Sequence, residues 1–331
     1  MKLLGSYPST RLRRNRKKQW SRRLVQENTI TTNDLIWPIF ITDGKSKKNK
    51  IPSMPGVFRY SVDKLGYVVE KAIKLKLPLL ALFPNTPDNK KDELGSEALN
   101  ENNLVCRALS YIKKNFKSEI GLMCDVALDP YTTHGHDGII RNNYVLNDET
   151  NEILVQQALL QASMGCDIIS PSDMMDGRIG KIRKALDKNG YELVQILSYA
   201  VKYASNFYSP FRSAIGSKSK LKGDKKNYQM NYYNKNEALR EVALDIKEGA
   251  DFVMVKPGMP YLDIIKLIHD NFKVPVFAYQ VSGEYSLLKN AIDKRIISEK
   301  SIEESLASFK RAGASAIITY FADYIASNLR K

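Results

Sequence analysis

Eight short runs of apolar, mostly β-branched residues recur along the chain, and amphipathic segments separate them. Within each run the apolar residues are continuous rather than alternating, which is typical of parallel strands buried on both faces. The intervening segments carry apolar residues at helical spacing; in the last, Ser301 and Glu304 fit a capping box and Gly313 ends the helix. The predicted strands are Leu35–Ile41, Pro78–Phe83, Ile120–Val126, Asp167–Ser170, Val194–Tyr199, Asp251–Lys256, Val274–Tyr279 and Ser315–Tyr320.

Eight strand–helix units with no second sheet predict an α/β fold, a (β/α)₈ TIM barrel that occupies residues 31–331. The alternative is a doubly wound open sheet, which should carry a Gly-rich phosphate-binding turn after an early strand; the sequence has none. The chain has 331 residues, of which 43% are hydrophobic and 26% charged, so it is not disordered by composition. No run of 18 apolar residues occurs, and we expect no membrane partner.

Positive charge is concentrated at the N-terminus. Nine of the net +15 charges lie in residues 1–23, which contain no acid, and the other 308 residues carry only +6. Residues 1–30 therefore form a basic arm with three interpretations: an organellar transit sequence, a nucleic-acid arm whose Tyr7 and Trp20 stack on bases, or an arm that packs on a neighbouring subunit. We favour the subunit arm and expect no nucleic-acid partner, because the first strand begins at Leu35 and leaves little room for a cleaved leader.

The cysteines give a further hint about the compartment. There are three, Cys106, Cys124 and Cys166, and none belongs to a C-x-x-C pair. An odd, scattered set does not form a disulfide framework, so we expect a reducing, cytoplasmic setting unless the arm is part of a transit sequence.

The predicted fifth and sixth strands start 57 residues apart, more than most other neighbours. The excess, residues 206–233, is rich in Lys, Tyr, Ser and Gly, and it follows a strand at the end of the barrel where active sites lie. We predict that it is an active-site lid, with a surface insertion as the alternative. Its basic residues would suit a carboxylate or phosphate substrate, although a solvated charge run has the same composition: Arg212, Lys222, Lys225 and Lys226.

Two lysines stand where predicted strands end. Lys256 closes the apolar run of the sixth strand, and Lys202 comes just beyond the fifth. Burial beside an apolar interior lowers the pKa of a lysine, and a second cation nearby lowers it further. A pKa near 7 would make the free amine about a thousandfold more abundant than in an ordinary lysine, as attack on a carbonyl requires. The alternative is that one or both lysines form salt bridges with carboxylates such as Asp125.

Acids and histidines follow the third predicted strand. His134 and His136 lack the ligand spacing of a zinc site, and three carboxylates surround them: Asp125, Asp129 and Asp137. Carboxylates prefer Mg²⁺ or a monovalent cation, but they could equally be counter-ions of the two lysines. The sequence leaves both possibilities open.

Several segments around these residues resemble the 5-aminolevulinate dehydratase (porphobilinogen synthase) family, and the likeness spans nearly the whole chain. The segments are MVKPGMPYLD around Lys256, YAVKYAS around Lys202, SPSDMMDGR from Ser170, FYSPFR ending at Arg212, and YQVSGEY from Tyr279. The resemblance implies a lyase that condenses two molecules of 5-aminolevulinate to porphobilinogen, with loss of two waters, in tetrapyrrole (haem) biosynthesis. It also implies a homo-octamer in which the N-terminal arm embraces a neighbour.

The resemblance assigns roles to individual residues. Lys256 matches the Schiff-base lysine of the site for the propionate half, and Lys202 the lysine of the acetate-half site. Ser282 and Tyr320 match the groups that hold the first carboxylate. The lid residues Arg212, Lys225 and Gln229 match those that hold the second, Lys225 less securely because an arginine often stands there. Ser172, at the end of the fourth strand, is a further substrate-binding candidate. The reaction itself needs proton transfers, which would fall to Asp125, Asp129, Asp137 or a water.

The resemblance also bears on metals. Zinc-dependent members carry three cysteines where this chain has Ala127, Asp129 and Asp137. Since carboxylates do not replace thiolates in a soft zinc site, we expect the aspartate-type branch without catalytic zinc. Glu241 matches the glutamate that binds an allosteric, activating Mg²⁺ through water. The competing enzyme hypothesis is a Schiff-base aldolase, which would need one imine-forming lysine and no second amine.

Overall fold

The structure is a computed structural model that describes residues 5–217, 221 and 223–329. Eight parallel strands form a ring that closes where the last pairs with the first, at Leu35↔Ile317 and Ile36↔Ile318. All eight predicted runs are strands of this ring, each starting within two residues of the predicted position, so the barrel prediction is confirmed. In ring order they are β1 (Leu35–Thr42), β4 (Leu79–Asn85), β5 (Gly121–Val126), β8 (Ile168–Pro171), β9 (Gln195–Lys202), β10 (Phe252–Lys256), β11 (Val276–Gln280) and β12 (Ala316–Thr319).

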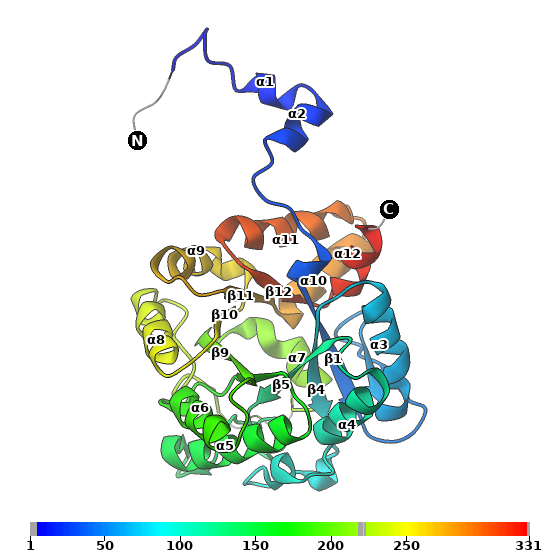
Figure 1. Ribbon diagram of the computed structural model, residues 1–331, viewed down its shortest axis with the longest axis vertical. Helices are drawn as coiled ribbons and strands as arrows, with labels where there is room; N and C mark the ends of the chain where they lie inside the picture. Colours follow the sequence, from blue (N-terminus) through cyan, green and yellow to red (C-terminus); the bar gives the residue numbers. More distant parts are fainter. Residues whose placement is uncertain (1–4, 218–220, 222, 330–331) are drawn as a thin grey trace.

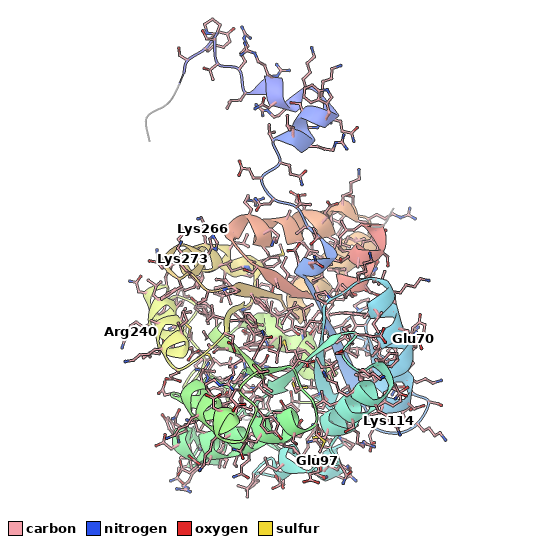
Figure 2. All side chains as sticks on the ribbon, viewed as in Figure 1. Glu70, Glu97, Lys114, Arg240, Lys266 and Lys273 are labelled. Carbon is pink, nitrogen blue, oxygen red and sulfur yellow. The ribbon has the colours of Figure 1, made fainter. Side chains whose placement is uncertain are left out.

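Helices surround the barrel (Figure 1), and charged side chains such as Glu70, Arg240 and Lys266 point away from it (Figure 2). The apolar stripes of these helices pack on the outer face of the strands, so strands are buried from both sides. The main helices are α3 (Leu65–Lys74), α4 (Leu104–Phe116), α5 (Asn147–Ser163), α6 (Arg178–Lys188), α8 (Asn236–Lys247), α9 (Leu262–Asn271), α11 (Lys300–Ala312) and α12 (Ala322–Asn328).

The predicted C-terminal end of α11 is correct and its predicted N-terminal capping box is not. Gly313 ends the helix in the left-handed conformation, with φ +107°, as predicted. The capping box is wrong, because Glu299 is the N-cap residue and Ser301 lies inside the helix. The Ser301 hydroxyl donates to the Ser298 carbonyl at 2.6 Å instead of capping a backbone N–H.

Short elements that the sequence did not predict lie in the loops. The first βα loop holds a hairpin of β2 (Lys48–Lys50) and β3 (Phe58–Ser61), and β3 also pairs with β1. Strand β2 is wholly exposed, so no apolar pattern marks it. The others are the hairpin β6 (Ile140–Arg141) and β7 (Tyr144–Val145), helices α7 (Ser209–Ala214) and α10 (Ser282–Asp293), and 3₁₀ turns η1 (Thr32–Asp34), η2 (Val62–Lys64), η3 (Asp88–Lys90), η4 (Ser96–Leu99), η5 (Asn206–Tyr208) and η6 (Met259–Tyr261).

A β-bulge interrupts the pairing of β9 with β10. Ser198 pairs with Val253 and Val201 with Val255, so Tyr199 and Ala200 together stand opposite the single residue between them on β10. Before the bulge, Ser198 points outward to Asp245 of α8, 2.5 Å from its carboxylate. Because side chains alternate along a strand, Lys202 would point outward too without the extra residue; the bulge turns it inward.

The basic arm extends away from the barrel (Figure 1). It contains α1 (Arg13–Arg16) and α2 (Gln19–Leu24), and most of its side chains are exposed, including Leu12, Trp20 and Leu24 at 62–77%. None of the described helices is long and apolar enough to span a membrane. The role of residues 1–30 in subunit contacts stays a prediction.

Candidate active site

Lys256 and Lys202 are register partners at the ends of the neighbouring strands β10 and β9. Lys202 is the last residue of its strand rather than a residue beyond it, which corrects the predicted limit at Tyr199. Both side chains are buried, 7% and 6% exposed. The two amines therefore enter the barrel mouth side by side, as the sequence suggested.

Four aromatic rings surround the amine of Lys256. Its Nζ lies 4.9 Å from the ring centre of Tyr199 and 4.8 Å from that of Tyr279, both on barrel strands. Two rings of the lid complete the shell, Tyr208 at 5.4 Å and Phe211 at 5.3 Å. Burial, and then the charge of Lys202, lower the pKa of Lys256 to about 7. At neutral pH about half of the molecules would hold the free amine, against roughly one in 2,500 for an ordinary lysine.

Lys202 has polar neighbours instead. Its Nζ lies 3.3 Å from Oδ2 of Asp137 and donates to the backbone carbonyl of Ser172. The salt-bridge alternative thus holds for one lysine of the two, and with Asp137 rather than Asp125. For Lys256 no salt bridge is found among the described residues.

Asp137 is the centre of a buried charge cluster. Lys225 of the lid lies 2.8 Å from Asp137 and 3.4 Å from Asp129, and the Gln229 amide donates to Asp137 at 3.3 Å. Burial alone would raise the pKa of Asp137, but Lys202 and Lys225 outweigh it and hold the pKa below its ordinary value. The two aspartates are counter-ions of the lysines in this structure.

The pKa values of Asp125 and Asp129 shift in the opposite direction from that of Asp137. Burial, and then the charge of Asp129, raise the pKa of Asp125 to about 6. Burial likewise raises the pKa of Asp129, against the attraction of Lys225. A carboxyl group whose pKa is raised toward 7 can both donate and accept protons near neutral pH.

The His-Gly-His segment lies beside this cluster. His136 Nδ1 is 3.1 Å from the hydroxyl of Tyr228, and both histidines line a cavity of about 600 Å³ next to the lid. In the described part of the chain, no group of three His, Cys, Asp or Glu side chains could hold a metal ion.

Two described parts of the predicted lid enter the site at different places. Helix α7 brings Phe211 to Lys256, and residues 225–229 reach Asp137. Lys225 and Gln229 are buried and Arg212 is partly buried on α7, and their role in binding stays a prediction. Lys226 is a correction, since its side chain is 70% exposed and pairs with Asp224 in solvent. Lys222 lies outside the described residues.

Known proteins resemble this chain over nearly its whole length. The family model described as delta-aminolevulinic acid dehydratase matches residues 9–328. The delta-aminolevulinic acid dehydratase of Bradyrhizobium diazoefficiens is 58% identical over 321 residues, 97% of this chain and 91% of that protein. The enzyme of the same name from Methanothermus sociabilis is 50% identical, over 98% of this chain and 99% of its own length. The chain belongs to the delta-aminolevulinic acid dehydratase family.

A solved structure agrees with this assignment. The delta-aminolevulinic acid dehydratase (porphobilinogen synthase) of Toxoplasma gondii, in complex with the reaction product porphobilinogen, superposes with a TM-score of 0.94 at 44% identity, covering 96% of this chain and 91% of that one. The predicted family, the lyase activity and the condensation of 5-aminolevulinate to porphobilinogen in tetrapyrrole synthesis are therefore confirmed.

Ser282 and Tyr320, the family's matched carboxylate-binding pair, lie one contact away from Lys256. Tyr320 shares a 2.9 Å hydrogen bond with the hydroxyl of Tyr279, whose ring faces the amine. The hydroxyl of Ser282 accepts from the backbone N–H of Phe211 at 2.9 Å. Both residues are buried, so the structure brings them to the Lys256 side of the site. Their role in binding stays a prediction.

Glu241 lies apart from the lysines, on α8 outside the barrel wall. It lines a cavity of about 230 Å³ together with Glu237, Asp176 and residues 226–230 of the lid. Burial raises the pKa of Glu241 to about 6, against the attraction of Arg178. Three carboxylates, of Glu241, Glu237 and Asp176, line this cavity with one cation, Lys226, and a hydrated Mg²⁺, which keeps several waters and needs one or two carboxylates, fits that donor set.

Two features of the site were missed in the sequence. Tyr199, which follows the outward-pointing Ser198 on β9, faces Lys256, and the continuous apolar run of this strand does not show which of its side chains point inward. Arg59, on the unpredicted hairpin, donates to the carbonyls of Ala214 at 2.6 Å and Ser213 at 2.7 Å. It thereby fixes the C-terminal end of the lid helix, where a cation also complements the helix dipole.

Proposed function

We propose that the condensation runs through two lysine imines, with Lys256 binding the 5-aminolevulinate that supplies the propionate half and Lys202 the acetate half. The observation that carries this proposal is the pairing of the two amines at adjacent strand ends, one of them with a pKa of about 7. A neutral amine adds to a ketone, and loss of water then leaves a protonated imine. Covalent attachment on both strands would hold two identical molecules in one orientation.

We assign a different chemical step to each lysine, because their surroundings differ in charge. On Lys256 the protonated imine is the electron sink, and the aromatic rings exclude water from it. On Lys202 the imine loses a proton from carbon and becomes an enamine, the nucleophile of the C–C bond. Asp137 stabilises the cationic forms of Lys202, while Asp125 and Asp129, with raised pKa values, are the groups suited to carry protons.

Substrate carboxylates would bind on opposite sides of the site. We assign the first to Ser282 and Tyr320, beside Lys256, and the second to Arg212, Lys225 and Gln229 of the lid. Lys225 already pairs with carboxylates of Asp129 and Asp137, so a substrate carboxylate would take over part of an existing contact. Ser172, whose carbonyl accepts from Lys202, would position that amine.

Borohydride reduction in the presence of 5-aminolevulinate, followed by peptide mapping, tests the two imines. We expect label on Lys256 and, at higher substrate concentration, on Lys202 as well. Label on Lys256 alone under every condition would contradict the second imine at Lys202 and leave the first. Label on neither lysine would contradict the proposal.

We further propose that the enzyme uses activating, allosteric Mg²⁺ at Glu241 and no catalytic zinc. Glu241 would hold the hydrated ion, with Glu237 and Asp176 lining the same cavity, and the bound Mg²⁺ would supply positive charge beside residues 226–230 of the lid. Zinc is disfavoured because the three cysteines are buried on different elements: burial raises the pKa of the Cys106 thiol on α4 to about 12 and that of Cys124 on β5 well above its usual value. Thiols held protonated are poor zinc ligands.

A thermal-shift titration with MgCl₂ tests this site without relying on activity. Wild type should gain stability with increasing Mg²⁺. Glu241→Gln should lose the shift, while the exposed control Glu192→Gln should keep it. An equal Mg²⁺ shift in Glu241→Gln would exclude the site.

The arm supports a proposal for assembly. Its exposed Leu12, Trp20 and Leu24 need an apolar partner, and we propose that a neighbouring subunit supplies it in a homo-octamer. Sedimentation of the chain without residues 1–23 should give smaller species than the full chain. Since the described cysteines are free thiols, we propose a cytoplasmic location, with an organelle as the alternative if the arm belongs to a transit sequence.

A further inference from the structure

Three tyrosine rings face the amine of Lys256, and their hydroxyl groups differ. The Tyr208 hydroxyl donates to the backbone carbonyl of Lys256 at 3.1 Å. The Tyr279 hydroxyl shares a 2.9 Å hydrogen bond with Tyr320. The Tyr199 hydroxyl has no hydrogen-bond partner among the described residues, although its side chain is fully buried.

This hydroxyl is an unexpected group at a position that packing alone would fill with phenylalanine. A buried polar atom without a partner lowers the stability of a fold, and an apolar group of the same shape avoids that cost. Phe211, on the other side of the same amine, has such a ring without a hydroxyl. Stability therefore gives no reason for the oxygen atom of Tyr199.

A second unpartnered polar atom lies in the same chamber. Oδ1 of Asp125, at the end of β5, is buried without a hydrogen-bond partner among the described residues. The charges of Asp125 and Tyr199 interact, and burial followed by that interaction keeps the pKa of Tyr199 far above neutrality. The hydroxyl is therefore a permanent donor, whereas Asp125 can change its protonation state.

We propose that Tyr199 is a further catalytic residue, whose hydroxyl donates a hydrogen bond to the ketone oxygen of the 5-aminolevulinate that reacts with Lys256. The inference rests on the proposed imine at Lys256 and adds a group to it. A donor placed at the oxygen stabilises the negative charge that develops when the amine attacks.

The step balances without any other reagent. Nζ of Lys256 forms a bond to the carbonyl carbon, and the oxygen takes up the proton released from nitrogen to give a carbinolamine. The C–O bond then breaks as the Asp125 carboxyl gives its proton to the leaving oxygen. Water departs, the nitrogen lone pair forms the protonated imine, and Asp125 is left as a carboxylate. Tyr199 keeps its proton throughout.

The test is Tyr199→Phe, which keeps the ring over Lys256 and removes only the oxygen. In single-turnover borohydride trapping, we expect the rate of imine formation at Lys256 to fall about 10- to 100-fold. The melting temperature should stay the same or rise, because an unpartnered buried hydroxyl has been removed. A residue with a purely structural role would show the opposite combination.

Tyr203→Phe is the matched control on the same strand end. Its hydroxyl donates to the Asn234 carbonyl at 2.9 Å, away from Lys256. We expect this variant to lose some stability and to form the imine at the wild-type rate.

The outcomes separate this inference from the proposed function. If wild type forms no trapped imine at Lys256, the proposed function fails. If wild type is labelled and Tyr199→Phe is labelled equally fast, only the role of Tyr199 is wrong. A lower melting temperature or loss of folding in Tyr199→Phe would also overturn the inference, because the hydroxyl would then have a structural partner.

Discussion

Lys256 and Lys202 are the same residue type at the same level of adjacent strands, yet their surroundings are opposite. Lys256 is enclosed by the rings of Tyr199, Tyr208, Phe211 and Tyr279. Lys202 touches Asp137 and a backbone carbonyl, in a cluster that also contains Lys225. Two adjacent strand ends therefore place one lysine in apolar surroundings and the other in polar surroundings.

The difference teaches how one fold can assign two tasks to one functional group. Burial among rings disfavours the ammonium form and prepares Lys256 to attack, while Lys202 lies 3.3 Å from the buried carboxylate of Asp137. The lid reinforces the division, because α7 brings apolar rings to one amine and residues 225–229 bring charge and amide groups to the cluster around the other. Four substitutions test this division, beginning with the largest expected effect.

Lys256→Met should abolish product formation, with kcat at least about 10³-fold below wild type, because no imine can form on the apolar side. The same change should stabilise the fold. In wild type the folded pKa of about 7 is below the unfolded value, so the unfolded chain binds more protons and stability rises with pH between about 7 and 10.5. The stability advantage of Met should thus be largest below pH 7.

Steady-state assays and urea unfolding at pH 6 and pH 9 measure both effects. A Met variant less stable than wild type at pH 6 would show that Lys256 is held as a satisfied cation, and the contrast between the lysines would disappear.

Asp137→Asn should lower kcat by about 100-fold and destabilise the fold by about 3–5 kcal/mol, since it leaves the cations Lys202 and Lys225 buried without their anion. Unfolding curves and kcat measure the two losses. The exposed Asp224→Asn, which breaks only the surface pair with Lys226, is the control and should change neither. Equal behaviour of the two variants would contradict the counter-ion role.

Lys202→Met isolates the influence of one lysine on the other. The cation of Lys202 is the second cause of the low pKa of Lys256, so its removal should raise that pKa. The rate of borohydride-trappable imine formation at Lys256 should then reach half its maximum at a higher pH than in wild type, and at pH 7 it should fall several-fold. An unchanged pH profile would mean that burial alone sets the pKa.

Arg59→Gln should have the smallest effect, a rise in KM of about 3- to 10-fold with little change in kcat. The guanidinium holds the end of α7, which carries Phe211 and Arg212, so its loss loosens the lid on the Lys256 side. Lys50→Gln, on the exposed strand of the same hairpin, should leave KM unchanged. A fall in kcat without a change in KM would assign Arg59 to the chemical step instead.

The barrel was predictable because apolar runs buried on both faces are visible in a sequence, and strand ends then locate Lys256, Asp125 and Ser172. The sequence also placed Lys202 near this end of the barrel, but the bulge that turns it inward was not predictable, since it changes register without changing hydrophobicity. Charge pairing was equally hidden: Lys225 and Lys226 are neighbours of the same type, yet one is buried against Asp137 and the other lies in solvent. Such differences arise from tertiary contacts, which composition does not record.

The extra residue of β9 also determines how many lysine amines point into the barrel. Removing either Tyr199 or Ala200 from the chain would bring the strand back into regular pairing and send Lys202 toward the outer helices, where Ser198 points now. The barrel would then offer a single amine to its substrate. Under the proposed two-imine mechanism, joining two copies of one molecule thus depends on one extra residue in β9.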